Sequence, residues 1–310
     1  MVNVMKVLIA TEKPFAKAAV DGIRKIVEGA GHKLALLEKY TQVDDLYAAV
    51  NDADALIVRS DKVTKEVVNA AKKLKIVVRA GAGFDNLDLT ACTEKGIVAM
   101  NTPGQNSNAV AELAIGMMIY VSRNCFTPGT GIELKGKTLG IHAFGNVGKL
   151  VAKLGQGFGM NVIAFDPYVS SDAIKSAGAT PVNTIEELYS GSNFLSLHIP
   201  ATAETKKSVG YDLVKRMPKG AALINTARKE VINEEELVKI LEERSDLKYV
   251  TDIAADNQAL LNEKFGTRVF ASPKKMGAET AEANVNAGLA AANQIVGFFA
   301  TGDRTFQLNK

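Results

Sequence analysis

The stretch LGIHAFGNVGKLVAKLGQGFGMNVIAFD, residues Leu139–Asp166, decides the fold of this chain. Its pattern predicts a strand over Thr138–Ala143, an amphipathic helix over Lys149–Phe158 and a second strand over Asn161–Phe165. A tight glycine turn joins the first strand to the helix, and the second strand ends on the acidic residue Asp166. Strand, turn, helix, strand and carboxylate in this order are typical of a Rossmann unit that binds a dinucleotide.

The glycine turn offers what a pyrophosphate needs. Gly145 lets the backbone approach the phosphates, Gly148 lets the helix pack closely on the strand, and Asn146 and Val147 between them bring amides to the positive end of the helix dipole. The first glycine of the usual G-x-G-x-x-G pattern is here Ala143. On the glycines alone, an ordinary turn between a strand and a helix therefore remains an alternative.

The carboxylate of Asp166 narrows the choice of cofactor. An acid roughly 20 residues after the turn accepts hydrogen bonds from a ribose diol. The same charge repels a 2′-phosphate, and no Arg or Lys follows until Lys175. The sequence therefore favours NAD over NADP.

Composition excludes several other classes of function. The chain has 310 residues, 47% of them hydrophobic, and a net charge of +3, which fits two domains with sizeable cores. No basic tract with interleaved aromatic residues points to nucleic acid, and the longest apolar segment, Val110–Val121, is too short to span a membrane. Cys92 and Cys125 lack metal-ligand spacing, so we expect no metal site and a reducing, cytoplasmic location.

Short apolar runs alternate with helical patterns along the chain, which predicts parallel sheets covered by helices. Predicted strands are Lys6–Ala10, Leu34–Leu37, Ala55–Arg59, Ile76–Ala80, Ile97–Met100, Phe194–Ile199, Ala221–Asn225, Tyr249–Asp252 and Val269–Ala271. Predicted helices are Phe15–Gly29, Thr64–Leu74, Leu87–Lys95, Thr184–Tyr189, Asp212–Met217 and Asn233–Glu243.

Two longer helical patterns, Ala109–Arg123 and Thr280–Phe299, are interpreted as crossings between two domains. We therefore predict an α/β protein with two doubly wound parallel-sheet domains and the active site in the cleft between them. A flavodoxin-like substrate domain would comprise residues 1–100 and 285–310, and a Rossmann NAD domain residues 101–284.

Hydride transfer also needs a cation for the substrate carboxylate and an acid/base for the hydroxyl proton. Arg228 follows a strand at the edge where such sheets bind ligands, although a surface arginine would fit the same position. His142 lies inside a strand, and His198 ends one, where it could touch the cofactor. No histidine follows His198, so Lys274 is the candidate base, because a buried lysine near another cation has a depressed pKa. A pair of solvated loop lysines is the alternative.

A second cationic region lies in the first half of the chain. Arg59 and Arg79 stand at the ends of neighbouring predicted strands, which suggests a second anionic group on the substrate, such as a phosphate. Ion pairs with Asp61 or Asp85 are the alternative explanation. The turn after Arg79 offers the amides of Gly81, Ala82 and Gly83 as a cradle for a carboxylate.

These residues lie in motifs that follow one another as in a known family. The motifs are VRS (58–60), VRAGAGFDNLD (78–88), NTPGQNSNAVAE (101–112), SLHIPATAET (196–205) and MPKGAALINTAR (217–228). Over nearly its whole length the chain resembles the D-2-hydroxyacid dehydrogenases, and among them the short D-3-phosphoglycerate dehydrogenases that carry a lysine in place of the catalytic histidine.

The resemblance implies a role for each matching position. Arg228 is implied as the catalytic arginine, Arg59 and Arg79 as ligands of a substrate phosphate, and Asn106 as part of the substrate pocket and hinge. The positions that the resemblance assigns to NAD contacts are Asp166, His198, Thr226, Ala227 and Asp252. A homodimer formed through the NAD domain is also implied.

The chain departs from the family pattern at several places. Lys274 replaces the acid/base histidine, and Asn257, with Asp256 beside it, stands where the partner glutamate is due. The connection Phe126–Ile132 is shortened, which weakens the case for the usual dimer. Because the chain ends at Lys310, we expect no C-terminal regulatory serine-binding domain.

The expected reaction is NAD-dependent oxidation of 3-phospho-D-glycerate to 3-phosphohydroxypyruvate, the first step of serine biosynthesis. Two alternatives remain open. The chain could act on another substrate, as a glyoxylate or hydroxypyruvate reductase or a D-lactate dehydrogenase. It could also be a catalytically silent NAD-sensing binding protein, because the Glu–His pair is lost.

Overall fold

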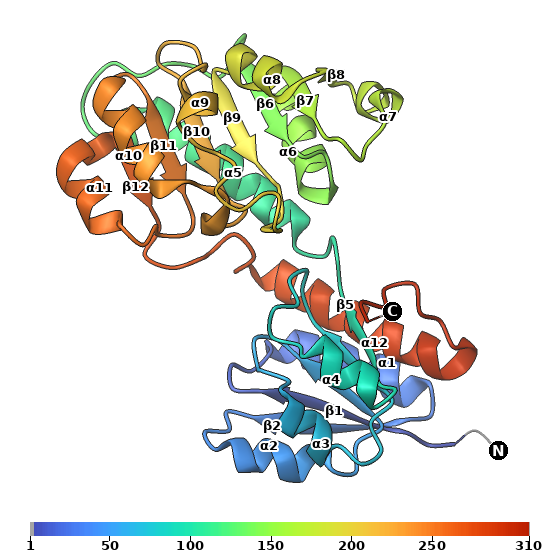
Figure 1. Cartoon of the computed structure of the whole chain (residues 1–310). Helices are drawn as coiled ribbons and strands as arrows, with labels where there is room; N and C mark the ends of the chain where they lie inside the picture. Colours follow the sequence, from blue (N-terminus) through green and yellow to red (C-terminus); the bar gives the residue numbers. More distant parts are fainter. Residues whose placement is uncertain (1–2, 310) are drawn as a thin grey trace. The chain divides into compact units, whose positions relative to one another are not determined.

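The computed structural model describes residues 3–309, and their contacts divide the chain into two compact units. Unit 1 comprises Met1–Asn106 with Thr280–Lys310, and unit 2 comprises Ser107–Glu279. Each unit has one parallel sheet with helices on both faces (Figure 1). This confirms the predicted α/β class with two doubly wound sheets.

Unit 1 has a five-stranded sheet in the order β2-β1-β3-β4-β5, which is the flavodoxin-like order. Its elements are β1 Lys6–Thr11, α1 Lys17–Gly29, β2 Lys33–Glu38, α2 Val43–Val50, β3 Ala55–Val58, α3 Lys65–Ala70, β4 Ile76–Arg79, α4 Leu89–Glu94, β5 Val98–Asn101 and α12 Ala281–Thr301.

Alternation along β1 shows how this sheet is covered. Val7 and Ile9 pack into a core shared with α1 and α12, whereas Leu8 and Ala10 pack into the core under α2, α3 and α4. Helix α12 therefore packs against α1, although the two are far apart in the sequence (Figure 1).

The end of the chain protects the edge of this sheet. Gln307 forms an antiparallel bridge to Met100 of β5, and the Leu308 amide donates to the Ala99 carbonyl at 2.8 Å. The Asn309 side chain adds bonds to the Ala99 amide and the Ile97 carbonyl. The edge strand β5 is thereby paired rather than left open.

Unit 2 has a seven-stranded sheet in the order β12-β11-β10-β9-β6-β7-β8. Its elements are α5 Ser107–Ser122, β6 Thr138–His142, α6 Asn146–Gly157, β7 Asn161–Phe165, α7 Ser171–Ser176, β8 Thr180–Pro181, α8 Ile185–Gly191, β9 Phe194–Leu197, α9 Tyr211–Val214, β10 Ala222–Asn225, α10 Glu234–Glu243, β11 Lys248–Thr251, α11 Gln258–Phe265 and β12 Val269–Ala271. Three 3-10 turns, Asn124–Phe126, Lys229–Val231 and Gly266–Arg268, complete it.

The strand order of unit 2 reverses between β6 and β9. At such a switch point the crevice beyond the carboxyl ends of the strands is the usual binding place for a dinucleotide. The quoted glycine turn follows β6, so the fold places it at the switch point.

Predicted and observed elements differ mainly at their ends. Strand β7 has the predicted bounds, but α6 begins at Asn146 instead of Lys149, because Gly145 is its extended N-cap (φ −76°, ψ −156°). Helix α3 ends at Ala70 rather than Leu74. The short elements α2, α7, α11 and β8 were not predicted. Within the described residues, no helix is long and apolar enough to cross a membrane.

Candidate functional site

The turn between β6 and α6 has the open geometry of a phosphate-binding loop. A Cβ on Gly145 would meet nothing within 4 Å, whereas a Cβ on Gly148 would lie 2.3 Å from the Ala143 carbonyl oxygen. Asn146 and Val147 occupy the first turn of α6, where backbone amides have no acceptor within the helix. The space at Gly145 and these amides fit the pyrophosphate of a dinucleotide.

Ala143, at the place of the missing glycine, has a positive φ of 80°. Glycine adopts this left-handed backbone freely, whereas a residue with a Cβ pays for it. The turn thus keeps the conformation that a glycine would favour, and alanine at this position strains the backbone.

Asp166 follows β7 and is held by two backbone amides. Its Oδ2 accepts a hydrogen bond from the Phe144 amide at 2.7 Å, and its Oδ1 accepts one from the Tyr168 amide at 2.8 Å. These bonds fix the carboxylate beside the glycine turn. That placement fits the predicted contact with a ribose.

Three neighbouring strands of unit 2 end on buried polar atoms that lack partners within the described residues. They are His198 Nε2 after β9, Thr226 Oγ1 after β10 and Asp252 Oδ1 after β11. Unpaired buried polar atoms are costly and call for an explanation. They are aligned along the carboxyl edge of the sheet, where a ligand could satisfy them. Ala227, beside Thr226, is also buried there.

His198 and His142 form an uncharged pair at this edge. Burial lowers the pKa of His142 to about 4, with Asp166 acting in the opposite direction. Burial, assisted by His142, lowers the pKa of His198 to about 3. The His142 ring also contacts Tyr189, with Nδ1 3.3 Å from the hydroxyl. Both rings are therefore neutral at neutral pH, and His142 packs against Tyr189.

Arg228 and Asp252 follow the neighbouring strands β10 and β11. Arg228 is half-buried after β10 and donates to the Ala227 carbonyl at 2.9 Å. Burial raises the pKa of Asp252, while the Gly277 amide, Lys275 and Arg228 act to lower it. A cation therefore stands at the strand edge that carries the unpartnered atoms.

The structure corrects the expectation for Lys274. Its side chain is exposed, so the burial that was expected to lower its pKa is absent. Asp256 does not contact it: the Asp256 carboxylate pairs with Lys229 at 2.5 Å. Asn257, at the position of the family glutamate, has a buried Oδ1 that finds no partner in the described chain.

In unit 1, Arg59 is tied to neutral oxygens. It donates to the Lys13 and Pro14 carbonyls at 3.2 and 3.3 Å and to Asn284 Oδ1 at 2.6 Å, and it lies over the Phe15 ring. The predicted alternative of a pair with Asp61 is not formed: Asp61 Oδ1 accepts from the Glu12 amide and the Tyr40 hydroxyl, and its Oδ2 is buried without a partner in the described chain.

Arg79 and the following turn are closely connected. Arg79 Nε donates to the Arg59 carbonyl at 3.0 Å, and a Cβ on Gly81 would lie 1.7 Å from Arg79 Nη1. The Gly81 amide donates to Thr102 Oγ1 at 2.6 Å. It is therefore not free to bind a carboxylate, contrary to the predicted role.

The other predicted substrate-binding residues of unit 1 are Ala82, Gly83 and Asn106. The Ala82 carbonyl accepts from the Asn101 side chain, while Gly83 and Asn106 are half-buried. Asn106 is the last residue of unit 1 before α5. Sequence reasoning missed Thr102 and Asn284, which bind Gly81 and Arg59, because nothing in a local pattern reveals partners so distant in the chain.

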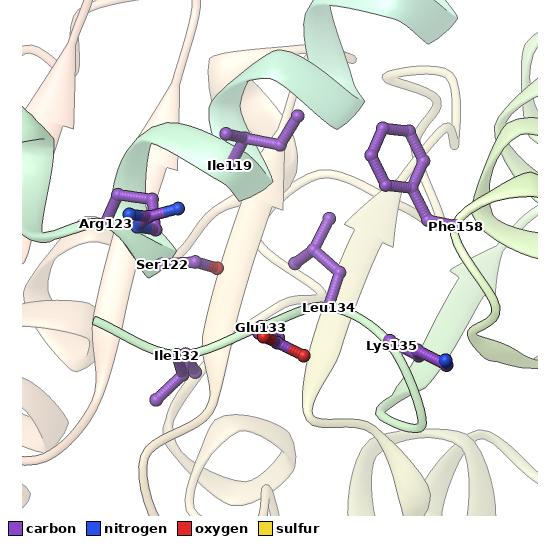
Figure 2. Close-up of a pocket in the computed structure, with 8 residues that line it drawn as sticks. All are labelled: Ile119, Ser122, Arg123, Ile132, Glu133, Leu134, Lys135 and Phe158. Atoms are coloured by element: carbon purple, nitrogen blue, oxygen red, sulfur yellow. The ribbon is translucent and has the colours of Figure 1, made fainter.

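Neither of the two described pockets is lined by one of these candidate residues. One, of about 290 Å³, is bounded by the end of α5, the segment 132–135 and Phe158 after α6; Figure 2 shows Ile119, Leu134 and Phe158 around it. The other, of about 370 Å³, lies along α12 beside Pro103 and Phe306. Within residues 3–309, no group of three or more His, Cys, Asp or Glu side chains forms a candidate metal site.

Comparisons with known proteins agree with this geometry. Residues 107–273 match the family model described as "D-isomer specific 2-hydroxyacid dehydrogenase, NAD binding domain". The solved structure of NAD⁺-bound 3-phosphoglycerate dehydrogenase from Entamoeba histolytica is 50% identical, covers 99% of both chains and has a TM-score of 0.89. The structure of D-2-hydroxyisocaproate dehydrogenase, at 22% identity and a TM-score of 0.82, shares the fold.

Two curated relatives extend the comparison. D-3-phosphoglycerate dehydrogenase of Methanocaldococcus jannaschii is 36% identical over 266 residues, 81% of this chain and 51% of the relative. Hydroxypyruvate reductase of Thermotoga maritima is 38% identical over 221 residues, 66% of this chain and 70% of the relative. The chain thus spans about half the length of the first relative. It belongs to the family of D-isomer specific 2-hydroxyacid dehydrogenases, and its unit 2 contains the NAD-binding domain of that family.

Proposed function

We propose that this protein oxidises 3-phospho-D-glycerate to 3-phosphohydroxypyruvate with NAD. The observation that carries the oxidoreductase chemistry is the row of unpartnered polar atoms on His198, Thr226 and Asp252 beside the cation Arg228. The choice of a phosphorylated substrate is supported by the 50% identity, over 99% of both chains, to a 3-phosphoglycerate dehydrogenase.

The residues of unit 2 would bind and orient the cofactor. Gly145, Asn146, Val147 and Gly148 would hold the pyrophosphate, and Asp166 the ribose diol. The unpartnered atoms after β9, β10 and β11, together with the Ala227 backbone, would line the rest of the site. When bound, NAD supplies the acceptor for the hydride that leaves C2 of the substrate.

Arg228 and Lys274 would carry the substrate chemistry. The Arg228 guanidinium would bind the substrate carboxylate and stabilise the carbonyl oxygen that develops at C2. Lys274 would accept the proton of the C2 hydroxyl. Because Lys274 is exposed here, the substrate and its surroundings would have to exclude water from the amine when they bind.

The phosphate would bind to unit 1, which we propose as the substrate-binding domain. Arg59 makes its described hydrogen bonds to neutral oxygens, so these bonds orient its guanidinium without neutralising its charge. Together with Arg79, whose Nε is fixed on the Arg59 carbonyl, it offers cationic donors suited to a phosphate. Ala82, Gly83 and Asn106 would contact the rest of the substrate, whereas the Gly81 amide is already engaged by Thr102.

One assay tests the reaction and the substrate together. NADH formation is measured on a panel of 2-hydroxy acids with and without a 3-phosphate. We expect kcat/KM to be greatest with 3-phospho-D-glycerate. Equal or better rates with D-lactate, glycolate or D-glycerate would replace the phosphorylated substrate by the second candidate. That candidate is favoured by the 38% identity to a hydroxypyruvate reductase. If no NADH forms with any acid, the catalytically silent NAD-sensing protein is the candidate function that remains.

The proposed base has its own test. Lys274→Ala should lose most turnover while NAD binding, measured by calorimetry, stays unchanged. Lys274→His restores the residue type of the family and should retain activity with a pH optimum at lower pH, since free histidine titrates near 6.5 and free lysine near 10.4. Near wild-type turnover in Lys274→Ala would exclude the lysine as base.

We further propose a homodimer formed through unit 2 and a cytoplasmic location. Phe126, Ile132 and Phe158 are 69%, 45% and 43% exposed. Phe126 and Ile132 belong to the α5–β6 connection, and Ile132 and Phe158 line the pocket of Figure 2. Exposed apolar side chains support an association surface. Analytical ultracentrifugation of Phe126→Ser/Phe158→Ser tests the dimer, and a monomeric wild type would contradict it.

The cytoplasmic location is supported by the cysteines. Both are free thiols, which suits a reducing compartment.

A further inference from the structure

The segment that carries Lys274 is fastened to the end of β11. Ser272 is 1% exposed, and its amide donates to the Thr251 carbonyl at 3.1 Å. Its hydroxyl lies 2.9 Å from the Asp252 carbonyl oxygen and 2.9 Å from the Lys274 carbonyl oxygen. The single hydroxyl hydrogen can reach either acceptor, so Ser272 links the backbone of Lys274 to the strand end.

A second bond fixes the other end of the segment. Asp252 is fully buried, and its Oδ2 accepts a hydrogen bond from the Gly277 amide at 2.8 Å. A Cβ on Gly277 would lie 2.8 Å from that same oxygen, closer than real Cβ atoms approach. A larger residue would therefore have to displace the Asp252 carboxylate. The backbone of residues 272–277 is held at both ends.

Lys274 has no other anchor in the described part of the chain. Its side chain is exposed and forms no hydrogen bond or ion pair there. What fixes its position is thus the backbone on either side. A catalytic group placed before substrate arrives avoids an entropic cost, and a displacement of about 1 Å can lower a rate by roughly 100-fold.

From this geometry, we infer that Ser272 and Gly277 are positioning residues for proton transfer by Lys274, Ser272 through its hydroxyl and Gly277 through its bond to Asp252. The inference rests on the proposed function. The two oxygens of the Asp252 carboxylate then have different roles: Oδ2 holds the Lys274 segment, and Oδ1 is available to the bound cofactor.

The test begins with Ser272→Ala in the full chain, assayed with NAD and 3-phospho-D-glycerate. We expect kcat to fall by roughly 10- to 100-fold with the KM for NAD changed less than about two-fold. Ser272→Thr keeps the hydroxyl and should recover most of kcat. Ser192→Ala is the matched control: Ser192 is also fully buried and donates to the Leu188 carbonyl at 2.5 Å, but it has no link to Lys274. Its kcat should equal that of the wild type.

Two further variants separate positioning from a general loss of structure. Gly277→Ala displaces the Asp252 carboxylate and should lower kcat like Ser272→Ala. In a Lys274→Ala background, Ser272→Ala should cause no additional loss, because residues that act through one another are not additive. If Ser272→Ala fails to fold, as judged by its thermal transition, the positioning role is tested with Gly277→Ala instead. Its kcat is then compared in the wild-type and the Lys274→Ala backgrounds.

The outcomes distinguish the two levels of the argument. No turnover of any 2-hydroxy acid by the wild type overturns the proposed function and this inference with it. Wild-type kcat in Lys274→Ala excludes the lysine as base, and with it this inference, but leaves the proposed reaction in place. Loss of activity in Lys274→Ala, together with wild-type kcat in Ser272→Ala and Gly277→Ala, overturns the positioning role alone. So does an equal loss from Ser272→Ala with and without Lys274.

Discussion

The two sheets have similar architecture but treat the polar groups at their strand ends differently. In unit 1, Arg59 and the Gly81 amide bond to groups of the same unit, namely three neutral oxygens and the Thr102 hydroxyl. In unit 2, polar atoms of His198, Thr226 and Asp252 are buried after three adjacent strands and find no partner in the described chain. Unit 1 also has two such atoms, Glu38 Oε1 at the end of β2 and Asp61 Oδ2 beyond β3, but these two strands are not adjacent. The units therefore differ in that only the described part of unit 2 has a row of unpartnered atoms over three adjacent strand ends, whereas the Arg59 cation of unit 1 is held by bonds within its own unit.

The largest expected effect comes from removing the cation of each unit in turn. Arg228→Ala should lower kcat by roughly 100- to 1,000-fold for every 2-hydroxy acid, because it removes stabilisation of the developing carbonyl. Arg59→Ala should lower kcat/KM by roughly 10- to 100-fold for the phosphorylated acid only, as expected for charged hydrogen bonds. Steady-state kinetics on both substrate types measures the two changes.

Arg24→Ala is the control for that pair. Arg24 lies in α1 of unit 1 and pairs with exposed Glu28 at 2.6 Å, away from the strand ends. Its kinetics should match the wild type. If Arg59→Ala lowers kcat/KM equally for phosphorylated and unphosphorylated acids, Arg59 has no role specific to the phosphate.

The second effect is the response of unit 2 to acid. The pKa values of His142 and His198 are lowered to about 4 and about 3, whereas unfolded histidine titrates near 6.5. Between these values the unfolded chain binds more protons, so stability falls as the pH decreases below 6.5. We expect a loss of roughly 2 to 4 kcal/mol at pH 5 relative to pH 7. Melting temperatures should fall by roughly 5 to 10 °C.

Thermal denaturation followed by circular dichroism measures this loss, and limited proteolysis at pH 5 should first cleave within residues 107–279. His142→Asn/His198→Asn should be less stable at both pH values but lose less between them. The raised pKa of Asp252 acts in the opposite direction, so the comparison with this variant is decisive. If the variant loses as much stability between pH 7 and pH 5 as the wild type, the two histidines are not the cause.

The third comparison concerns helix packing against neighbouring elements. In unit 2, a Cβ on Gly148 would lie 2.3 Å from a backbone oxygen, whereas in unit 1 a Cβ on Gly22 would meet the flexible end of Leu289 at 2.5 Å. Gly148→Ala should therefore destabilise by roughly 2 kcal/mol, because the backbone must move. Gly22→Ala should stay within about 1 kcal/mol of the wild type, since Leu289 can rotate and alanine favours the helix. Urea denaturation measures both, and equal costs would contradict the rigid contact.

Local patterns were enough for the fold class and for the position of the glycine turn and the acid after β7. The bounds of β7, the acid after it and the glycine turn follow from periodicity and from residue types that lie within one βαβ unit. The engagement of the Gly81 amide by Thr102 and the fastening of Lys274 through Asp252 and Gly277 depend on bonds between distant parts of the chain. The exposure of Lys274 is likewise decided by packing, which no local pattern encodes.

The smallest expected effect concerns the turn that first indicated the dinucleotide. Ala143 has a φ of 80°, so Ala143→Gly relieves strain of roughly 1–2 kcal/mol but gives back roughly 0.5–1 kcal/mol to the more flexible unfolded chain. A net gain of about 0.5 kcal/mol, with NAD affinity unchanged, is expected from urea denaturation and calorimetry. Gly145→Ala reverses the pattern, because its Cβ would meet no protein atom within 4 Å but would fill the space left for phosphate. That variant should keep the stability of the wild type and bind NAD more weakly. Weaker NAD binding in Ala143→Gly would mean instead that the alanine methyl group itself contributes to the cofactor site, and that the strain at this turn serves binding rather than merely being tolerated.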